Sequence, residues 1–85
     1  MRIWAKIYRG EKLTKSKIFE DERSLDPTSF ERSILDLCGG WDIPTPILLK
    51  CNYENFRVFH ITSFKRDDFV EQVDFDKLVL EDASL

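Results

Sequence analysis

Hydrophobic and polar residues alternate along the start of the chain. One side of this segment carries Ile3, Ala5 and Ile7, and the other side carries Arg2, Trp4, Lys6 and Tyr8. A period of two is typical of a β-strand with one buried face, so we expect a strand over residues 3–9. Gly10 and Glu11 then occupy the place of a tight hairpin turn.

A second strand is expected over residues 12–20, where the alternation is less regular. Leu13 and Phe19 fall on one face of that strand, and Ile18 falls on the other. This pattern predicts a β-bulge, or a second face that is partly covered.

The segment from Asp26 to Gly40 has the one long helical pattern. Asp26 is suited to the N-cap and Pro27 to the first helical position, while Thr28 and Glu31 offer an alternative capping box. Apolar residues recur at helical spacing at Phe30, Ile34, Leu37 and Cys38. Two glycines end the pattern, so we expect about three helical turns that pack on the strands.

The second half of the chain favours strands. Pro44 and Pro46 predict a rigid loop, because proline disfavours helix and removes a ladder donor. A short apolar strand is then expected over residues 47–51 and a turn over residues 52–55. Residues 56–64 form the longest β-rich run. Apolar residues on both sides of it predict a central strand or a covered outer face.

The C-terminal part completes the predicted fold. Asp68 and Glu71 predict a single helical turn, residues 75–80 a last strand, and residues 81–85 a fraying tail. The resulting order is β-β-α-β-β-short helix-β. It indicates an α+β fold, with a small, mostly antiparallel sheet and one main helix packed on one of its faces.

Length and charge limit what this fold can do. The chain has 85 residues, which is enough for a single domain over residues 1–85. Its net charge of −3 argues against a strongly electrostatic nucleic-acid binder. The charge is nevertheless uneven, because residues 1–20 are basic and residues 67–85 are acidic. We expect the two ends to neutralise each other across strands, and the alternative is a basic face that attracts a polyanion.

Several common chemistries are missing from the sequence. No apolar run suits a signal peptide or a membrane span, and Cys38 and Cys51 do not make a disulfide framework. We therefore expect a cytoplasmic protein without membrane contact. One histidine, two distant cysteines and three glycines predict neither a metal site nor a phosphate loop, so no cofactor is expected.

The residues with catalytic potential have simpler structural explanations. Cys38 lies on the apolar stripe of the predicted helix, which indicates a core residue. His60 falls within the predicted strand over residues 56–64, on the side of Val58 and Thr62, where a hydrogen-bonded, half-buried imidazole is the simplest expectation. An enzyme that uses His60 and Thr62 stays as a hypothesis, although no catalytic residue is predicted.

Three parts of the sequence carry a resemblance. They are the opening Arg-Ile-Trp-Ala-Lys-Ile, the central Thr-Pro-Ile-Leu-Leu-Lys and the segment over residues 59–78. Together they resemble a family of short, uncharacterised bacterial proteins that begin with an Ile-Trp-x-Lys-Ile-type strand. These proteins end in a Thr-x-Phe…Phe-x-Glu-x-x-Asp-Phe-Asp-x-Leu pattern. The likeness covers nearly the whole chain. It implies a stand-alone intracellular domain and carries no activity.

The remaining candidate site is the polar side of the first strand. Its residues are Arg2, Trp4, Lys6 and Tyr8, and the neighbouring candidates in the predicted central strand are Phe59 and His60. Alternating basic and aromatic residues on an open sheet can bind RNA or single-stranded DNA by stacking and phosphate contacts. The favoured interpretation is an apolar face buried against a protein partner or a second copy. The sequence thus predicts a non-enzymatic interaction module, most simply a homodimer.

Overall fold

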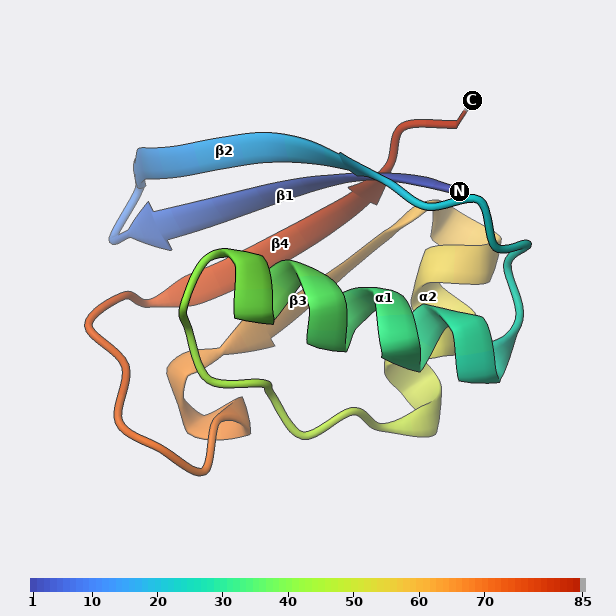
Figure 1. The fold of residues 1–85 in the computed structure, drawn as a ribbon. Helices are drawn as coiled ribbons and strands as arrows, with labels where there is room; N and C mark the ends of the chain where they lie inside the picture. Colours follow the sequence, from blue (N-terminus) through green and yellow to red (C-terminus); the bar gives the residue numbers. More distant parts are fainter. Residues whose placement is uncertain (85) are drawn as a thin grey trace.

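Four antiparallel strands form one sheet in a computed structural model that describes residues 1–84 (Figure 1). The strand order is β2-β1-β4-β3. The strands are β1 (Arg2–Arg9), β2 (Lys12–Glu20), β3 (Ile61–Lys65) and β4 (Lys77–Asp82). The helices are α1 (Pro27–Gly40), α2 (Lys50–Phe59) and the short 3-10 helix η1 (Arg66–Asp68). The predicted α+β class is confirmed.

The N-terminal hairpin follows the sequence pattern, including the bulge. The register changes from Ile7 opposite Lys15 to Tyr8 opposite Leu13. Thr14 therefore has no partner on β1, and its hydroxyl donates a 3.1 Å hydrogen bond to the carbonyl oxygen of Ile7. A bulge of this kind bends an edge strand and increases its twist.

Helix α1 begins at the predicted cap. The carboxylate of Asp26 accepts a 2.9 Å hydrogen bond from the backbone N–H of Ser29, and Pro27 occupies the first turn. The helix lies across one face of the sheet (Figure 1). Its buried residues are Phe30, Ser33, Ile34, Leu37 and Cys38. They include every member of the predicted apolar stripe.

The core lies between this helix and the inward side of the sheet. The strands contribute Ile3, Ala5, Ile7, Phe64, Leu78 and Leu80. The segment between η1 and β4 closes one end of the core with Phe69, Val73 and Phe75. The rings of Phe69 and Phe75 meet edge to face, with centroids 5.3 Å apart. Each fully buried aliphatic or aromatic side chain contributes about 1.5–3 kcal/mol to stability.

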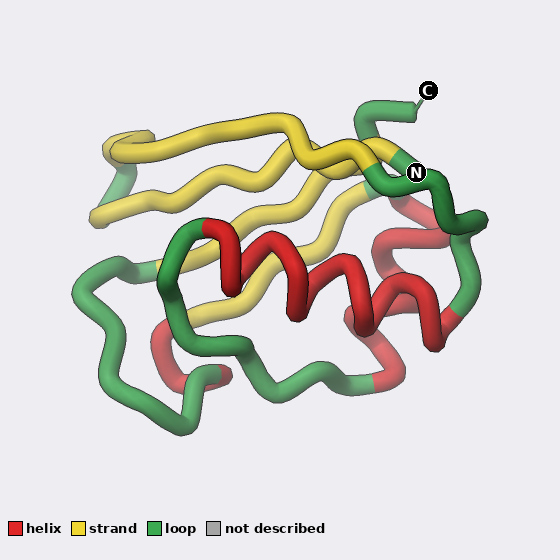
Figure 2. The backbone as a smooth tube through the Cα atoms, viewed as in Figure 1, coloured by secondary structure: helices red, strands yellow, loops and turns green. Residues whose placement is uncertain are grey.

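The main correction concerns the second helix, which the sequence analysis did not predict. Residues 50–59 form α2 beside β3, as the secondary-structure colouring of Figure 2 also shows. The predictions of a strand over residues 47–51 and a turn over residues 52–55 are therefore wrong. The long strand predicted over residues 56–64 is also wrong in its first half, because β3 begins only at Ile61.

Two tertiary contacts explain why this segment is helical. The ring of Phe56 is fully buried against Phe30 of α1, with ring centroids 4.8 Å apart. The ring of Tyr53 also contacts the ring of Phe30, with centroids 5.7 Å apart. Asn52, which suggested a turn, instead accepts a 2.8 Å hydrogen bond from the backbone N–H of Leu49 at the helix start. Packing on α1 overrides the β-propensity of the aromatic residues.

The C-terminal predictions need smaller corrections. The single helical turn lies at Arg66–Asp68, slightly before its expected place. The last strand includes Glu81 and Asp82, so the predicted tail begins too early. Leu85, the last residue of that tail, lies outside the described residues.

Asn52 gives a test of this arrangement. It is buried, and its side-chain amide donates a 3.3 Å hydrogen bond to the hydroxyl of Thr62 in β3. We expect Asn52→Ala to lower the free energy of unfolding by about 1–3 kcal/mol, because both this bond and the helix cap are lost. Urea denaturation measures the change. The matched control is Asn55→Ala on the exposed side of α2, which should stay within about 0.5 kcal/mol of the wild type. Equal effects of the two variants would contradict this role of Asn52.

Candidate interaction surface

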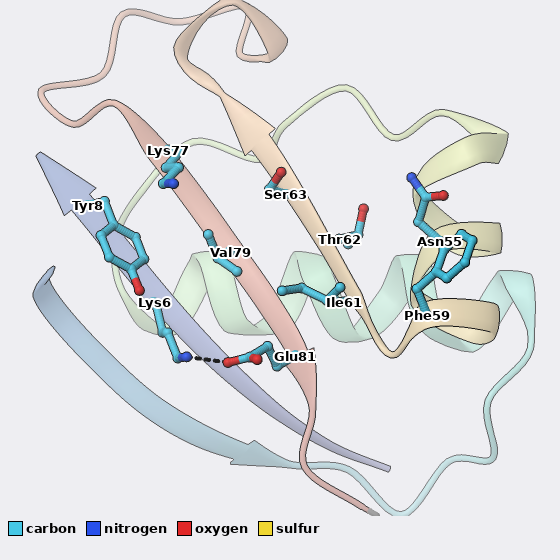
Figure 3. Close-up of a pocket in the computed structure, with 10 residues that line it drawn as sticks. All are labelled: Lys6, Tyr8, Asn55, Phe59, Ile61, Thr62, Ser63, Lys77, Val79 and Glu81. Carbon is cyan, nitrogen blue, oxygen red and sulfur yellow. Dashed lines mark hydrogen bonds and ion pairs between the residues drawn. The ribbon is translucent and has the colours of Figure 1, made fainter. Parts of the chain in front are cut away.

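Within residues 1–84, no helix covers the side of the sheet opposite α1. Figure 3 views this side, with α1 behind the strands and α2 beside β3. The register places three rows of outward side chains across β2, β1, β4 and β3. We call them the Trp4 row (Ile18, Trp4, Glu81, Ile61), the Lys6 row (Ser16, Lys6, Val79, Ser63) and the Tyr8 row (Leu13, Tyr8, Lys77, Lys65). Together these rows are the open face.

The open face exposes several large apolar side chains. Trp4 is 39% exposed, Ile61 41%, and Leu13 and Ile18 44% each. Phe59 of α2, which is 68% exposed, adds an aromatic ring at the border of the face (Figure 3). Of these residues, Ile18 and Trp4 are direct neighbours across strands, and exposed apolar patches mark interaction sites in soluble proteins.

Lys6 of the open face and Arg2 beside it each have a carboxylate partner within the chain. Lys6 forms an ion pair with Glu81 (Figure 3). Its ammonium also lies 3.7 Å from the ring centroid of Trp4. Arg2, at the end of β1, forms a 3.0 Å ion pair with Glu20. The Lys6–Glu81 ion pair joins the basic N-terminal segment to the acidic C-terminal segment across neighbouring strands, as expected for one of the basic residues, whereas Arg2 is paired within the N-terminal segment.

The Tyr8 row is the more basic end of the face. The ammonium of Lys77 lies 4.9 Å from the ring centroid of Tyr8, and Lys65 is the direct neighbour of Lys77 on β3. The carboxylate of Glu81 lies in the Trp4 row instead. The open face is therefore charged unevenly along the strands, with a basic end and an acidic end.

A hollow of about 670 Å³ lies where α2 borders the open face. Asn55 and Phe59 of α2 line one side of it, and Ser63, Val79 and Lys6 lie on its sheet side (Figure 3). The hollow is continuous with the open face and mixes polar with apolar walls. It thus extends the candidate surface beyond β3.

All the predicted site residues except His60 lie on or beside the open face. Trp4, Lys6 and Tyr8 project together from β1, Arg2 lies at their end, and Phe59 reaches the border from α2. His60 does not lie in a strand, so its predicted position is wrong. It ends α2 in the left-handed region, at φ 63°, and donates its backbone N–H to the carbonyl oxygen of Phe56 at 3.0 Å.

The side chains of His60 and Thr62 have separate surroundings. The imidazole of His60 is about half exposed, with Nδ1 3.9 Å from the carboxylate of Asp82. The hydroxyl of Thr62 is buried and accepts the hydrogen bond from Asn52. These positions give His60 a clear structural role as the corner between α2 and β3.

The two thiols differ in burial. Cys38 is fully buried, which confirms it as a core residue, and Cys51 is exposed on α2. Burial disfavours the thiolate and raises the pKa of the Cys38 thiol to about 11. A thiol with such a pKa is a poor nucleophile at neutral pH.

The acidic residues near the C-terminus have structural partners. Asp68 accepts a 2.8 Å hydrogen bond from the backbone N–H of Lys65, and Asp76 pairs with Arg66 at 2.8 Å. Within residues 1–84, no group of three or more His, Cys, Asp or Glu side chains is placed to hold a metal ion. None of the helices in that range is long and apolar enough to cross a membrane.

The sequence analysis missed the residues that β3 and β4 contribute to the face. On β4, Val79 pairs with Lys6 and Glu81 pairs with Trp4. On β3, Ser63 pairs with Val79 and Ile61 pairs with Glu81. The alternation of Lys77, Val79 and Glu81 with buried Leu78 and Leu80 is the signal for β4. No local signal assigns that strand to the neighbourhood of β1.

Comparisons of the chain with known protein families, with curated proteins and with solved structures find no match. The function must therefore be argued from the open face itself.

The buried thiol gives a pH-dependent test. Its pKa is raised from 9.0 to about 11 in the folded state, so its contribution to stability is complete below about pH 9 and is lost as the pH rises toward 11. We expect the difference in free energy of unfolding between the wild type and Cys38→Ala to narrow between pH 8.5 and about pH 10.5. Urea titrations at several pH values measure this difference. A constant difference would contradict the raised pKa.

The left-handed conformation of His60 gives a second test. We expect His60→Val to lower the free energy of unfolding by about 1–3 kcal/mol, because a β-branched residue is strained at φ 63°. The free energy of unfolding of His60→Gly should fall no more than about 0.5 kcal/mol below that of the wild type, since glycine adopts this φ without strain. Thermal or urea unfolding of both variants measures the contrast. Similar losses in both would indicate that the imidazole, and not the backbone, stabilises the corner.

Proposed function

We propose that this protein is a non-enzymatic interaction module that forms a homodimer in the cytoplasm through its open face. The observation that carries the proposal is the exposure of Trp4, Ile18, Leu13 and Ile61 on one uncovered sheet. A small sheet with one covered face leaves its other face to a partner, and aromatic residues are enriched in such interfaces.

The polar contacts of the face favour a protein partner over a nucleic acid. A strand of RNA or DNA needs free cations for its phosphates and free ring faces for its bases. Lys6 and Arg2 are paired with carboxylates, and one side of the Trp4 ring is covered by Lys6. The net charge of −3 adds repulsion at long range.

A second copy is the partner that fits the composition of the face. The face carries apolar side chains together with charges of both signs, so an identical surface supplies a complement to each of them. Most homo-oligomers use this kind of two-fold, self-complementary contact. The two free cysteines in residues 1–84 suit a reducing compartment such as the cytoplasm.

Sedimentation velocity tests the proposal. We expect the wild type to be a dimer at tens of micromolar and Trp4→Asp to raise the dissociation constant at least about 30-fold, because a carboxylate replaces a central aromatic anchor. The matched control is Leu35→Asp, which alters an equally exposed apolar residue on α1, away from the open face, and should leave the dimer intact.

Three results would contradict the proposal. They are a monomeric wild type, a dimer that tolerates Trp4→Asp, and an oligonucleotide that quenches tryptophan fluorescence in a salt-dependent way. The last result would favour the alternative of RNA or single-stranded DNA binding, since Trp4 is the tryptophan on the face and Trp41 packs on Phe19 at 5.3 Å.

A further inference from the structure

The unequal ends of the open face select one way for two copies to stack. Resting on the proposed function, we infer that the two sheets pack face to face about a two-fold axis that lies along the Lys6 row, perpendicular to the strands. Two sheets that pack face to face lie about 10 Å apart, and in the aligned class of packing their strands stay within about 30° of each other. In this class, a two-fold axis between the sheets lies close to the strand direction or close to the direction across the strands.

With the axis across the strands, each strand lies over the same strand of the second copy and runs in the opposite direction. The Trp4 row of one copy then lies over the Tyr8 row of the other. Ile18 faces Leu13 of the second copy, and Trp4 faces its Tyr8. Glu81 faces Lys77 of the second copy. Ile61 faces Lys65 of the second copy. Two of the four facing pairs are thus apolar or aromatic, one joins a carboxylate to a cation, and one sets an apolar side chain against a lysine.

With the axis along the strands, each row faces its own copy. The Tyr8 rows then coincide, which brings Lys65 and Lys77 of both copies into one layer. The two Glu81 carboxylates gather in the other layer, opposite Trp4. Lys65 then faces Leu13 of the second copy and Lys77 faces its Tyr8, so the layer of the two Tyr8 rows gathers four lysines and none of the Glu81 carboxylates. Like charges clustered in one layer are costly in an interface, so charge complementarity favours the axis across the strands.

The middle row suits a position on the axis. Ser16 and Ser63 are small exposed residues at the two ends of this row, and Val79 is short and largely buried. Lys6 is the long side chain of the row. Its ammonium is turned toward Glu81 (Figure 3) and lies over the ring of Trp4. Glu81 thus lies between Lys6 of its own chain and Lys77 of the second copy, in an alternating row of charges.

Crosslinking from the middle row tests the axis. In a Cys51→Ser background, Ser16→Cys and Ser63→Cys are prepared separately and treated with a short bis-maleimide, while the buried Cys38 stays unreactive. A residue on the axis faces the same residue of the second copy. We therefore expect each variant to form a crosslinked homodimer, and most of the dimer to be crosslinked. The reagent must reach less than the ~14 Å that separates β2 from β3 across three strand spacings.

Two controls make the result specific. Ser24→Cys in the same background places an exposed thiol in the connector before α1, and we expect no crosslink from it. An equimolar mixture of the Ser16→Cys and Ser63→Cys proteins should give little mixed product. With the axis along the strands, the same mixture would give the mixed product and neither variant would crosslink alone.

The outcomes separate this inference from the proposed function. A dimer by sedimentation that yields mainly the mixed product overturns the axis and leaves the homodimer in place. Self-crosslinking at Ser16 without Ser63 also overturns it, because that result indicates pairing of the β2 edges. A monomer by sedimentation overturns both. Self-crosslinking of both variants, with none at Ser24, supports the stacked arrangement.

Discussion

The structure depends on one constraint, which is the alternation of inward and outward side chains along β1, the strand that pairs with a neighbour on each side. β1 is paired on one side with β2 and on the other with β4, so its side chains divide strictly between the two faces of the sheet. Ile3, Ala5 and Ile7 meet α1 in the core, while Trp4, Lys6 and Tyr8 form the centre of the open face. A slip of one residue would exchange the two sets, which makes this register strongly specified.

Local patterns were sufficient to predict the elements whose signals lie within a few residues. The alternation of β1, the irregular β2 and the Asp26 cap with its apolar stripe all gave correct elements. The helix α2 had no such pattern. Its Val58 and Phe59 favour a strand locally and are exposed in the helix, and the contacts of Phe56 and Tyr53 with Phe30 decide the conformation. A contact between residues so far apart in the sequence leaves no periodic signal.

The candidate surface was predictable to the same extent. Trp4, Lys6 and Tyr8 share a face by simple alternation, so the β1 part of the surface follows from the sequence. Glu81 and Val79 belong to it through the pairing of β1 with a strand more than 70 residues later, which no local pattern encodes. His60 was misplaced because its conformation marks the end of a helix that the sequence analysis did not predict.

The bulge at Thr14 has a consequence for the kind of assembly that this protein can form. β2 is the exposed edge of the sheet, and an unprotected edge adds further strands from other molecules without limit. The bulge distorts that edge, and Lys12, Lys15 and Lys17 place repelling charges along it. Lateral growth into fibres is thereby discouraged, while contact through the broad side of the sheet stays open.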